Sequence, residues 1–326
     1  MVHSYPAISH LNDPGDCDCP GPVHFYSRHL KAIFGRAVAK AGLNLGVPCP
    51  HRFNPDGPCV YCHPAGFRPF ATGPDVPSMT EQIDGHIPRV TKRYRTDKVL
   101  AYFQAETSTA GTLAFLGPRF EAALSHKDIC GMVISTRPDA IDPAKLDFIA
   151  QLGQEHQKPV WMEYGMQSLH DRSLRAIKRG HDAACALSAI HESRQRGLGV
   201  GVHTILGLPG ESLQDMIDTH RALGETGLDT VKIHHLQVYR DTALAAQFET
   251  GQVPLFDTFR EYIEALAQVL RHIPWDVKVQ RVITNGQPDL LLGPVWDINK
   301  QDALGMLKRY LLRNDIRQGD ALNSDN

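Results

Sequence analysis

The chain has 326 residues, 42% of them hydrophobic and 21% charged, which is the composition of a soluble globular protein with one large domain or two ordinary ones. The formal net charge of −2 excludes a strong overall attraction to nucleic acid or anionic membranes, although a local basic strip can still bind RNA. No apolar run of about 18 residues predicts a transmembrane helix, and residues 1–10 lack the basic and apolar stretches of a signal peptide. We therefore expect a cytoplasmic protein with no membrane partner.

The first predicted segment is an irregular N-terminal arm. Residues 1–24 are rich in Pro, Gly, Asp and His, show no periodicity, and contain Cys17 and Cys19. A second metal site at these two thiols would need further ligands that the sequence does not identify. Two incidental thiols on an extension are the simpler interpretation.

The predicted core runs from residue 25 to residue 240. From about residue 42, short apolar runs alternate with longer amphipathic segments, a pattern typical of a parallel sheet with crossover helices. The predicted strands are 43–47, 99–104, 131–136, 160–164, 199–206 and 230–236. The predicted helices are 79–87, which we expect Pro88 to end, 113–125, 143–153, 170–177, 183–197 and 212–226. Six βα units predict an α/β fold, a partial (β/α)6 TIM-like barrel.

The pattern changes after residue 240. It predicts a helix at 257–271, a strand at 277–282, a helix at 301–312 and a polar tail. We expect residues 241–326 to form a C-terminal α/β extension that closes the open side of the barrel.

Three cysteines follow the first predicted strand closely. Nine residues separate Cys49 from Cys59, and two separate Cys59 from Cys62. Because the sites of parallel βα folds lie at the C-terminal ends of the strands, this loop is expected at the barrel mouth. A structural zinc usually takes four protein ligands, so His51 or His63 would have to complete a zinc knuckle. The alternative is an iron–sulfur cluster with one iron left open.

Further candidate residues, most of them polar, lie on or after the other five predicted strands. In chain order they are Gln104, Thr107, Arg137, Glu163, Gln167, Arg179, His203, Gly207, Lys232, His234 and His235. A carboxylate in a buried strand, such as Glu163, needs a partner. Structural interpretations stay open: a helix N-cap near Thr107, a surface pair of Arg137 with Asp139, a helix C-terminal cation at Arg179, and satisfied core histidines on the sixth strand.

The order of these motifs resembles the radical S-adenosylmethionine (radical SAM) superfamily, and in it a small bacterial family close to the catalytic subunit of Elongator. The cysteine spacing departs from the usual three and two, but a longer first gap occurs in that branch. The usual Gly-Gly-Glu-like turn is absent, and Gln104 and Thr107 stand in its place. The similar motifs are Phe-Gln-Ala-x-Thr-Ser-Thr at 103–109, Arg-Pro-Asp at 137–139, Glu-x-Gly-x-Gln-Ser at 163–168 and Gly-x-Pro-Gly-Glu at 207–211.

The resemblance implies a partial barrel and two cofactors. Cys49, Cys59 and Cys62 would hold a [4Fe–4S] cluster whose fourth iron binds S-adenosylmethionine. Reductive cleavage of S-adenosylmethionine would give a 5′-deoxyadenosyl radical, so the chain would need a reductase, ferredoxin or flavodoxin as electron donor. The residues implied in binding the cofactor are Gln104, Thr107, Arg137, Glu163, Gln167, Arg179, His203 and Gly207.

The same resemblance implies tRNA as the substrate, at the wobble uridine. Residues 89–98 contain five basic residues that can contact phosphates. A charge run is also often a solvated face. Two alternatives stay open: a radical enzyme acting on a small molecule, and a zinc-binding module without catalysis.

Overall fold

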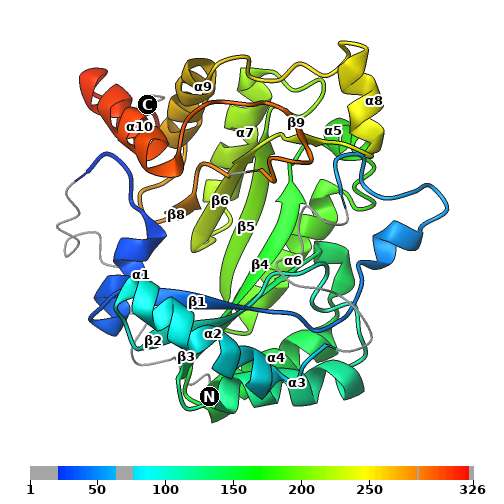
Figure 1. The fold of residues 1–326 in the computed structure, drawn as a ribbon, viewed down its shortest axis with the longest axis vertical. Helices are drawn as coiled ribbons and strands as arrows, with labels where there is room; N and C mark the ends of the chain where they lie inside the picture. The colour runs from blue at the N-terminus through cyan, green and yellow to red at the C-terminus, as the bar shows by residue number, and fades with distance from the viewer. Residues whose placement is uncertain (1–20, 64–75, 285, 323–326) are drawn as a thin grey trace.

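The computed structural model describes residues 21–63, 76–284 and 286–322. Its centre is a seven-stranded, entirely parallel sheet in the order β1-β2-β3-β4-β5-β6-β8. The sheet curls into a half barrel with helices along its outer side (Figure 1). The strands are β1 (Val38–Leu43), β2 (Lys98–Phe103), β3 (Ile129–Thr136), β4 (Val160–Gln167), β5 (Gly199–Leu206), β6 (Thr230–His235) and β8 (Lys278–Arg281). The short strands β7 (Val238–Tyr239) and β9 (Leu291–Gly293) form a separate antiparallel pair.

Amphipathic helices alternate with these strands. They are α1 (Tyr26–Phe34), α2 (Met79–Tyr94), α3 (Leu113–Ser125), α4 (Pro143–Glu155), α5 (Asp171–Ala176), α6 (Ala183–Gln195), α7 (Leu213–Gly224), α8 (Ala243–Glu249), α9 (Phe259–Arg271) and α10 (Lys300–Arg313). Side-chain caps fix several starts: Ser78 and Ser212 form capping boxes, and Asp142 and Asp182 accept backbone N–H groups. The predicted fold class, a partial TIM-like barrel, is confirmed.

The predicted first strand was wrong in position. The structure places β1 at Val38–Leu43, paired in parallel with β2, rather than at 43–47. Alternate residues of β1 are buried, and the buried ones are two alanines and Leu43, so the apolar signal is weak. Beyond the strand, Gly46 has a φ of +73°, which turns the chain out of the extended conformation.

The predicted end of the second helix at Pro88 was also wrong. Helix α2 continues through Pro88 to Tyr94. A proline inside a helix removes one backbone donor and leaves the carbonyl four residues earlier, here that of Asp84, without its usual partner. Both Pro88 and Asp84 are exposed, so water can take the place of the missing bond.

The C-terminal segment joins the sheet. Strand β8 pairs in parallel with β6, and Phe25 forms a further parallel bridge with Val279. Helix α9 packs against α7, and α10 packs against α9. This agrees with the predicted α/β extension, whereas the boundary at residue 240 and the closing role stay predictions. Strands β7 and β9 and helices α1 and α8 were not predicted.

Two sequence-based predictions fall on undescribed residues. Cys17, Cys19 and most of the 1–24 arm lie outside the described residues, as does the end of the polar tail. In the described part of the chain, no helix is long and apolar enough to cross a membrane.

Candidate active site

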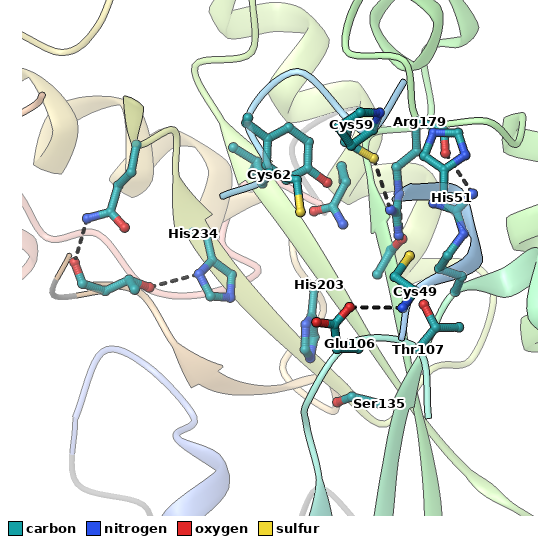
Figure 2. Close-up of a pocket in the computed structure, with 18 of the residues that line it drawn as sticks. Cys49, His51, Cys59, Cys62, Glu106, Thr107, Ser135, Arg179, His203 and His234 are labelled. Carbon is teal, nitrogen blue, oxygen red and sulfur yellow. Dashed lines mark hydrogen bonds between the residues drawn. The ribbon is translucent and has the colours of Figure 1, made fainter. Parts of the chain in front are cut away.

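A cavity of about 470 Å³ lies at the C-terminal ends of the barrel strands. Figure 2 shows the thiols of Cys49, Cys59 and Cys62 around it, with His203 and His234 apart from them. Of the residues predicted from the sequence, those that line it are Cys49, Cys59, Cys62, Gln104, Thr107, Arg137, Gln167, Arg179, His203, His234 and His235. Strand ends far apart in the chain therefore meet at one site, as the parallel topology requires.

Backbone hydrogen bonds hold the cysteine loop at both ends. The N–H of Cys49 donates to Glu106 Oε2 at 2.9 Å, and the N–H of Cys62 donates to the carbonyl of Cys59 at 2.9 Å. Val60 lies between them and donates to the carbonyl of Ile177 at 3.1 Å. These contacts bring three free thiols to the cavity.

Glu106 is a site residue that the sequence interpretation missed. It lies in the turn after β2, between the predicted Gln104 and Thr107, with a φ of +60°. Besides the amide of Cys49, it forms an ion pair with Arg52 at 3.2 Å. The sequence did offer one signal for Glu106, because it is a polar residue in the same turn as the candidates Gln104 and Thr107.

The thiols do not converge on a single point. Among the described residues, no group of three or more His, Cys, Asp or Glu side chains lies close enough together to hold one metal ion. In an iron–sulfur cluster each thiolate binds a different iron, so its cysteines surround the cluster rather than one ion. The arrangement of Cys49, Cys59 and Cys62 around one cavity fits that requirement.

Cationic neighbours favour the thiolate form of Cys59. Burial opposes ionisation, but His51 and Arg179 together lower the pKa of this thiol to about 6. Burial instead raises the pKa of Cys62 to about 11. Arg52 Nη2 lies 3.7 Å from the sulfur of Cys62.

Two arginines form one connected cationic wall. Arg179 Nε donates to the carbonyl of Gly165 at 3.1 Å, and its Nη1 donates to Cys59 Sγ at 3.5 Å. Arg137 Nη2 donates to the carbonyl of Arg179 at 2.7 Å and, together with Nε, to the Asp139 carboxylate at 2.8 Å. The surface pair considered for Arg137 thus exists, but the guanidinium also lines the cavity.

Some buried polar atoms on the cavity wall have no hydrogen-bond partner among the described residues. Arg137 Nη1 and the hydroxyl of Thr107 are among them, and both residues are at most 3% exposed. A buried polar group without a hydrogen bond costs about 1–3 kcal/mol. Such atoms fit a cavity built for a polar, charged ligand, and an amino acid carboxylate is one.

Glu163 and Gly207 are predicted cofactor residues that are absent from the cavity lining. Glu163 is 1% exposed and lies beneath the cavity, where it accepts from His203, Tyr102 and Lys232. Gly207 faces the ring of Phe256, which a Cβ there would approach to 3.0 Å. The structure thus gives Glu163 the partner that its burial requires.

The sixth strand separates its polar residues. Lys232 is buried beneath the cavity, and His234 Nδ1 lies 2.8 Å from the hydroxyl of Thr284. His235 also borders the cavity but stacks among core aromatic rings, at 4.6 Å between its centroid and that of Trp296. His235 therefore packs as a core residue, but it is not a satisfied histidine, because its buried Nδ1 has no hydrogen-bond partner among the described residues.

Comparison with known proteins identifies the family. Residues 43–223 match the model of the Radical SAM superfamily, and residues 228–313 match that of the Radical_SAM C-terminal domain. This chain belongs to the radical SAM superfamily. It is therefore a radical SAM enzyme, and its membership confirms S-adenosylmethionine and a [4Fe–4S] cluster as the cofactors of its chemistry, which requires an electron donor.

Two relatives match this radical SAM enzyme over nearly their whole length. The uncharacterized protein YtqA of Bacillus subtilis is 32% identical over 91% of both chains. Protein YhcC of Escherichia coli is 33% identical over 92% of this chain and 95% of its own.

More distant similarity reaches the Elongator branch. The tRNA uridine(34) acetyltransferase of Methanocaldococcus infernus is 26% identical over 57% of this chain and 34% of its own length. The structure of M. infernus Elp3 superposes with a TM-score of 0.67 at 19% identity, over 86% of this chain and 64% of that one. At that identity the superposition demonstrates the shared fold alone.

Proposed function

We propose that this radical SAM enzyme modifies tRNA at the wobble uridine, with Cys49, Cys59 and Cys62 holding the cluster. The observation that carries the catalytic part is the meeting of three free thiols with Arg137 and Arg179 around one cavity at the strand ends. When bound, the cofactors supply one-electron chemistry, the reductive cleavage of S-adenosylmethionine and hydrogen abstraction from the substrate. The protein supplies position and exclusion of water.

The chain's own residues are suited to orient that cofactor. In our proposal the free Nη1 of Arg137 and the hydroxyl of Thr107 bind its charged amino acid end, because both are buried and unpaired in the described structure. Arg179 keeps Cys59 ionised and in place. Gln104 and Gln167 offer amide groups from neighbouring strand ends on the same wall.

A group of cations supports an RNA substrate. Arg281, on β8, lines the cavity and makes no hydrogen bond or ion pair with another described residue. Lys300, at the start of α10, has a lowered pKa because of burial and the nearby charges of Arg281 and Arg93. Arg93 belongs to the basic segment 89–98 on α2. Three cations from three separate elements therefore gather near the cavity, where phosphates can bind.

The name of the distant M. infernus relative points to the same substrate class, tRNA uridine 34. The decisive experiment is mass spectrometry of tRNA nucleosides from a strain that lacks the gene, compared with the complemented strain. We expect one modified wobble uridine to disappear and to return on complementation. Unchanged nucleosides would overturn the tRNA assignment and favour a small-molecule substrate.

Binding measurements test the cationic group directly. Replacing Arg281 or Lys300 with glutamine should weaken tRNA binding and lower the dependence of log K on log salt by about 1 for each lost phosphate contact. Lys127→Gln is the matched control, because Lys127 is exposed just before β3, at the N-terminal ends of the strands and so away from the cavity at their C-terminal ends. Equal losses in all three variants would argue against a specific binding face.

A further inference from the structure

A buried network of charges lies directly beneath the cavity. Glu163 Oε2 lies 2.8 Å from His203 Nε2, 3.0 Å from Lys232 Nζ, 2.8 Å from the hydroxyl of Tyr102 and 3.0 Å from that of Ser135. Its second oxygen, Oε1, accepts from Gln280 Nε2 at 2.7 Å. Five strands, β2 to β6, and the added strand β8 thus meet at one carboxylate.

The packing around this carboxylate leaves room for it. A Cβ on Gly201 would lie 3.3 Å from Glu163 Cγ and would collide with the hydroxyl of Thr230. Lys40 adds a second cation at 3.6 Å from Oε1. A structural ion pair needs one cation, whereas here one carboxylate has two lysines and a histidine.

The contacts of His203 Nε2 cannot all be hydrogen bonds at once. This nitrogen lies 2.8 Å from Glu163 Oε2, to which it can donate, and 3.0 Å from Lys232 Nζ, from which it can accept. A neutral imidazole carries one proton, so Nε2 is a donor in one tautomer and an acceptor in the other. The geometry therefore accommodates two tautomers, and they differ in whether Nδ1 carries the proton.

The other ring nitrogen is available to a ligand. His203 lines the cavity with 17% of its side chain exposed, and Nδ1 makes no hydrogen bond with any described residue. When Nε2 accepts from Lys232, Nδ1 carries the proton and presents a donor to the cavity. When Nε2 donates to Glu163, Nδ1 has no proton and presents an acceptor.

We propose that His203 passes protons between a bound substrate and Lys232, and that Glu163 holds both side chains in position. A proton leaves the Lys232 ammonium for Nε2 while the Nδ1 proton leaves for the substrate. Lys232 is then a neutral amine, and His203 has Nε2–H directed at Glu163. The reverse sequence moves a proton from the substrate through His203 to Lys232. After product release, proton exchange with water returns Lys232 to its starting protonation state. The inference rests on the proposed function only in placing the substrate in this cavity.

The ionisation of both groups suits this role. Burial lowers the pKa of Lys232 to about 7, against the attraction of Glu163, so the amine exchanges its proton near neutral pH. Burial and Lys232 lower the pKa of His203 to about 4, so the ring stays neutral and can switch tautomer. The charged and titratable groups facing this pair are Glu163, Lys40, Tyr102, His234 and Arg281.

NMR of the full-length, anaerobically purified protein with ¹⁵N-labelled histidine tests the relay without any substrate. We expect His203 to be the Nδ1–H tautomer below pH 7 and the Nε2–H tautomer above it. His220 is the internal control, because its Nδ1 donates to the carbonyl of Met216 at 2.7 Å and its Nε2 accepts from Thr204 at 2.9 Å. Its tautomer should not change over this range.

Two variants separate the relay from a structural role. Lys232→Met should lock His203 as the Nε2–H tautomer at all pH values. Glu163→Gln removes the charge that raises the pKa of Lys232, so the switching midpoint should move to lower pH. A single His203 tautomer between pH 5 and 9 in the wild-type protein, or unchanged switching in Lys232→Met, would overturn the proposal. Neither result depends on whether tRNA is the substrate.

Discussion

Arg179 Nη1 lies 3.5 Å from the sulfur of Cys59, although 120 residues separate the two in the chain. Arg179 is 7% exposed, and its guanidinium also donates to the carbonyl of Gly165, so it links the cysteine loop to the end of β4. A fork of several donors makes this double contact possible, and a lysine ammonium cannot reproduce it.

Arg179→Lys should therefore loosen the cysteine loop and, through the cluster that we propose Cys59 to hold, weaken S-adenosylmethionine binding to the reconstituted enzyme. Loss of the charge-assisted hydrogen bond to Cys59 costs about 1.5–3 kcal/mol, which sets an upper limit of roughly a 150-fold rise in Kd. Equilibrium binding under anaerobic conditions measures it. Arg175→Lys, at an exposed position on α5, is the control and should bind as the wild type does. Equal affinities in both variants would remove Arg179 from the site.

Cys59→Ala should lower the iron content of the anaerobically purified protein from about four per chain and abolish cleavage of S-adenosylmethionine. Cys185→Ala should change neither, because Cys185 lies in the first turn of α6 and does not line the cavity. Iron analysis and detection of 5′-deoxyadenosine are the measurements. A colourless wild-type protein with one bound zinc would contradict the cluster assignment.

Gly180→Ala should destabilise the protein more than Gly197→Ala. Both glycines have similar positive φ values, +80° and +74°, so the backbone cost of a side chain is shared. A Cβ at Gly180 would lie 2.8 Å from His51 Nδ1, whereas at Gly197 it would meet nothing within 4 Å. Overpacking costs about 1–3 kcal/mol. Denaturant unfolding of the two variants gives this difference, and equal values would mean that His51 moves freely aside.

Buried His220 should make the fold sensitive to mild acid. Burial lowers its pKa from 6.5 to about 4, so between these pH values the unfolded chain binds a proton that the folded chain does not. The free energy of unfolding therefore falls as the pH drops from 6.5 to 4, by roughly 3 kcal/mol for this group. His220→Gln should flatten that part of the pH dependence, and His191→Gln, at an exposed position, should not. Identical slopes in wild type and His220→Gln would contradict the assignment.

Local patterns predicted the central strands well because β2 to β6 are mostly buried apolar runs with clear helices between them. β1 was misplaced because its buried face consists mainly of alanine. Gln167 and His203 were found as candidates because the C-terminal ends of strands in parallel folds meet at one side of the sheet. Arg179 was a candidate only through the resemblance to the radical SAM superfamily.

Contacts between distant segments were beyond that reasoning. The hydrogen bond from Gln280 to Glu163 spans 117 residues, and no local pattern indicates it. Likewise, Lys232 reaches Tyr102 from a strand 130 residues away. Sequence patterns indicate which face of a strand is buried, but not which buried polar groups become partners.

The position of β8 has a consequence for engineering this enzyme. Gln280 and Arg281 belong to the segment after residue 240, but Gln280 donates to Glu163 and Arg281 lines the cavity. A chimera joined at residue 240 would therefore combine the buried carboxylate of one protein with the hydrogen-bond donors of another. Exchange of the C-terminal segment between relatives should therefore succeed only when the residues that correspond to Glu163 and Gln280 come from the same protein. In this barrel, the C-terminal segment and the residues around Glu163 therefore have to be exchanged together.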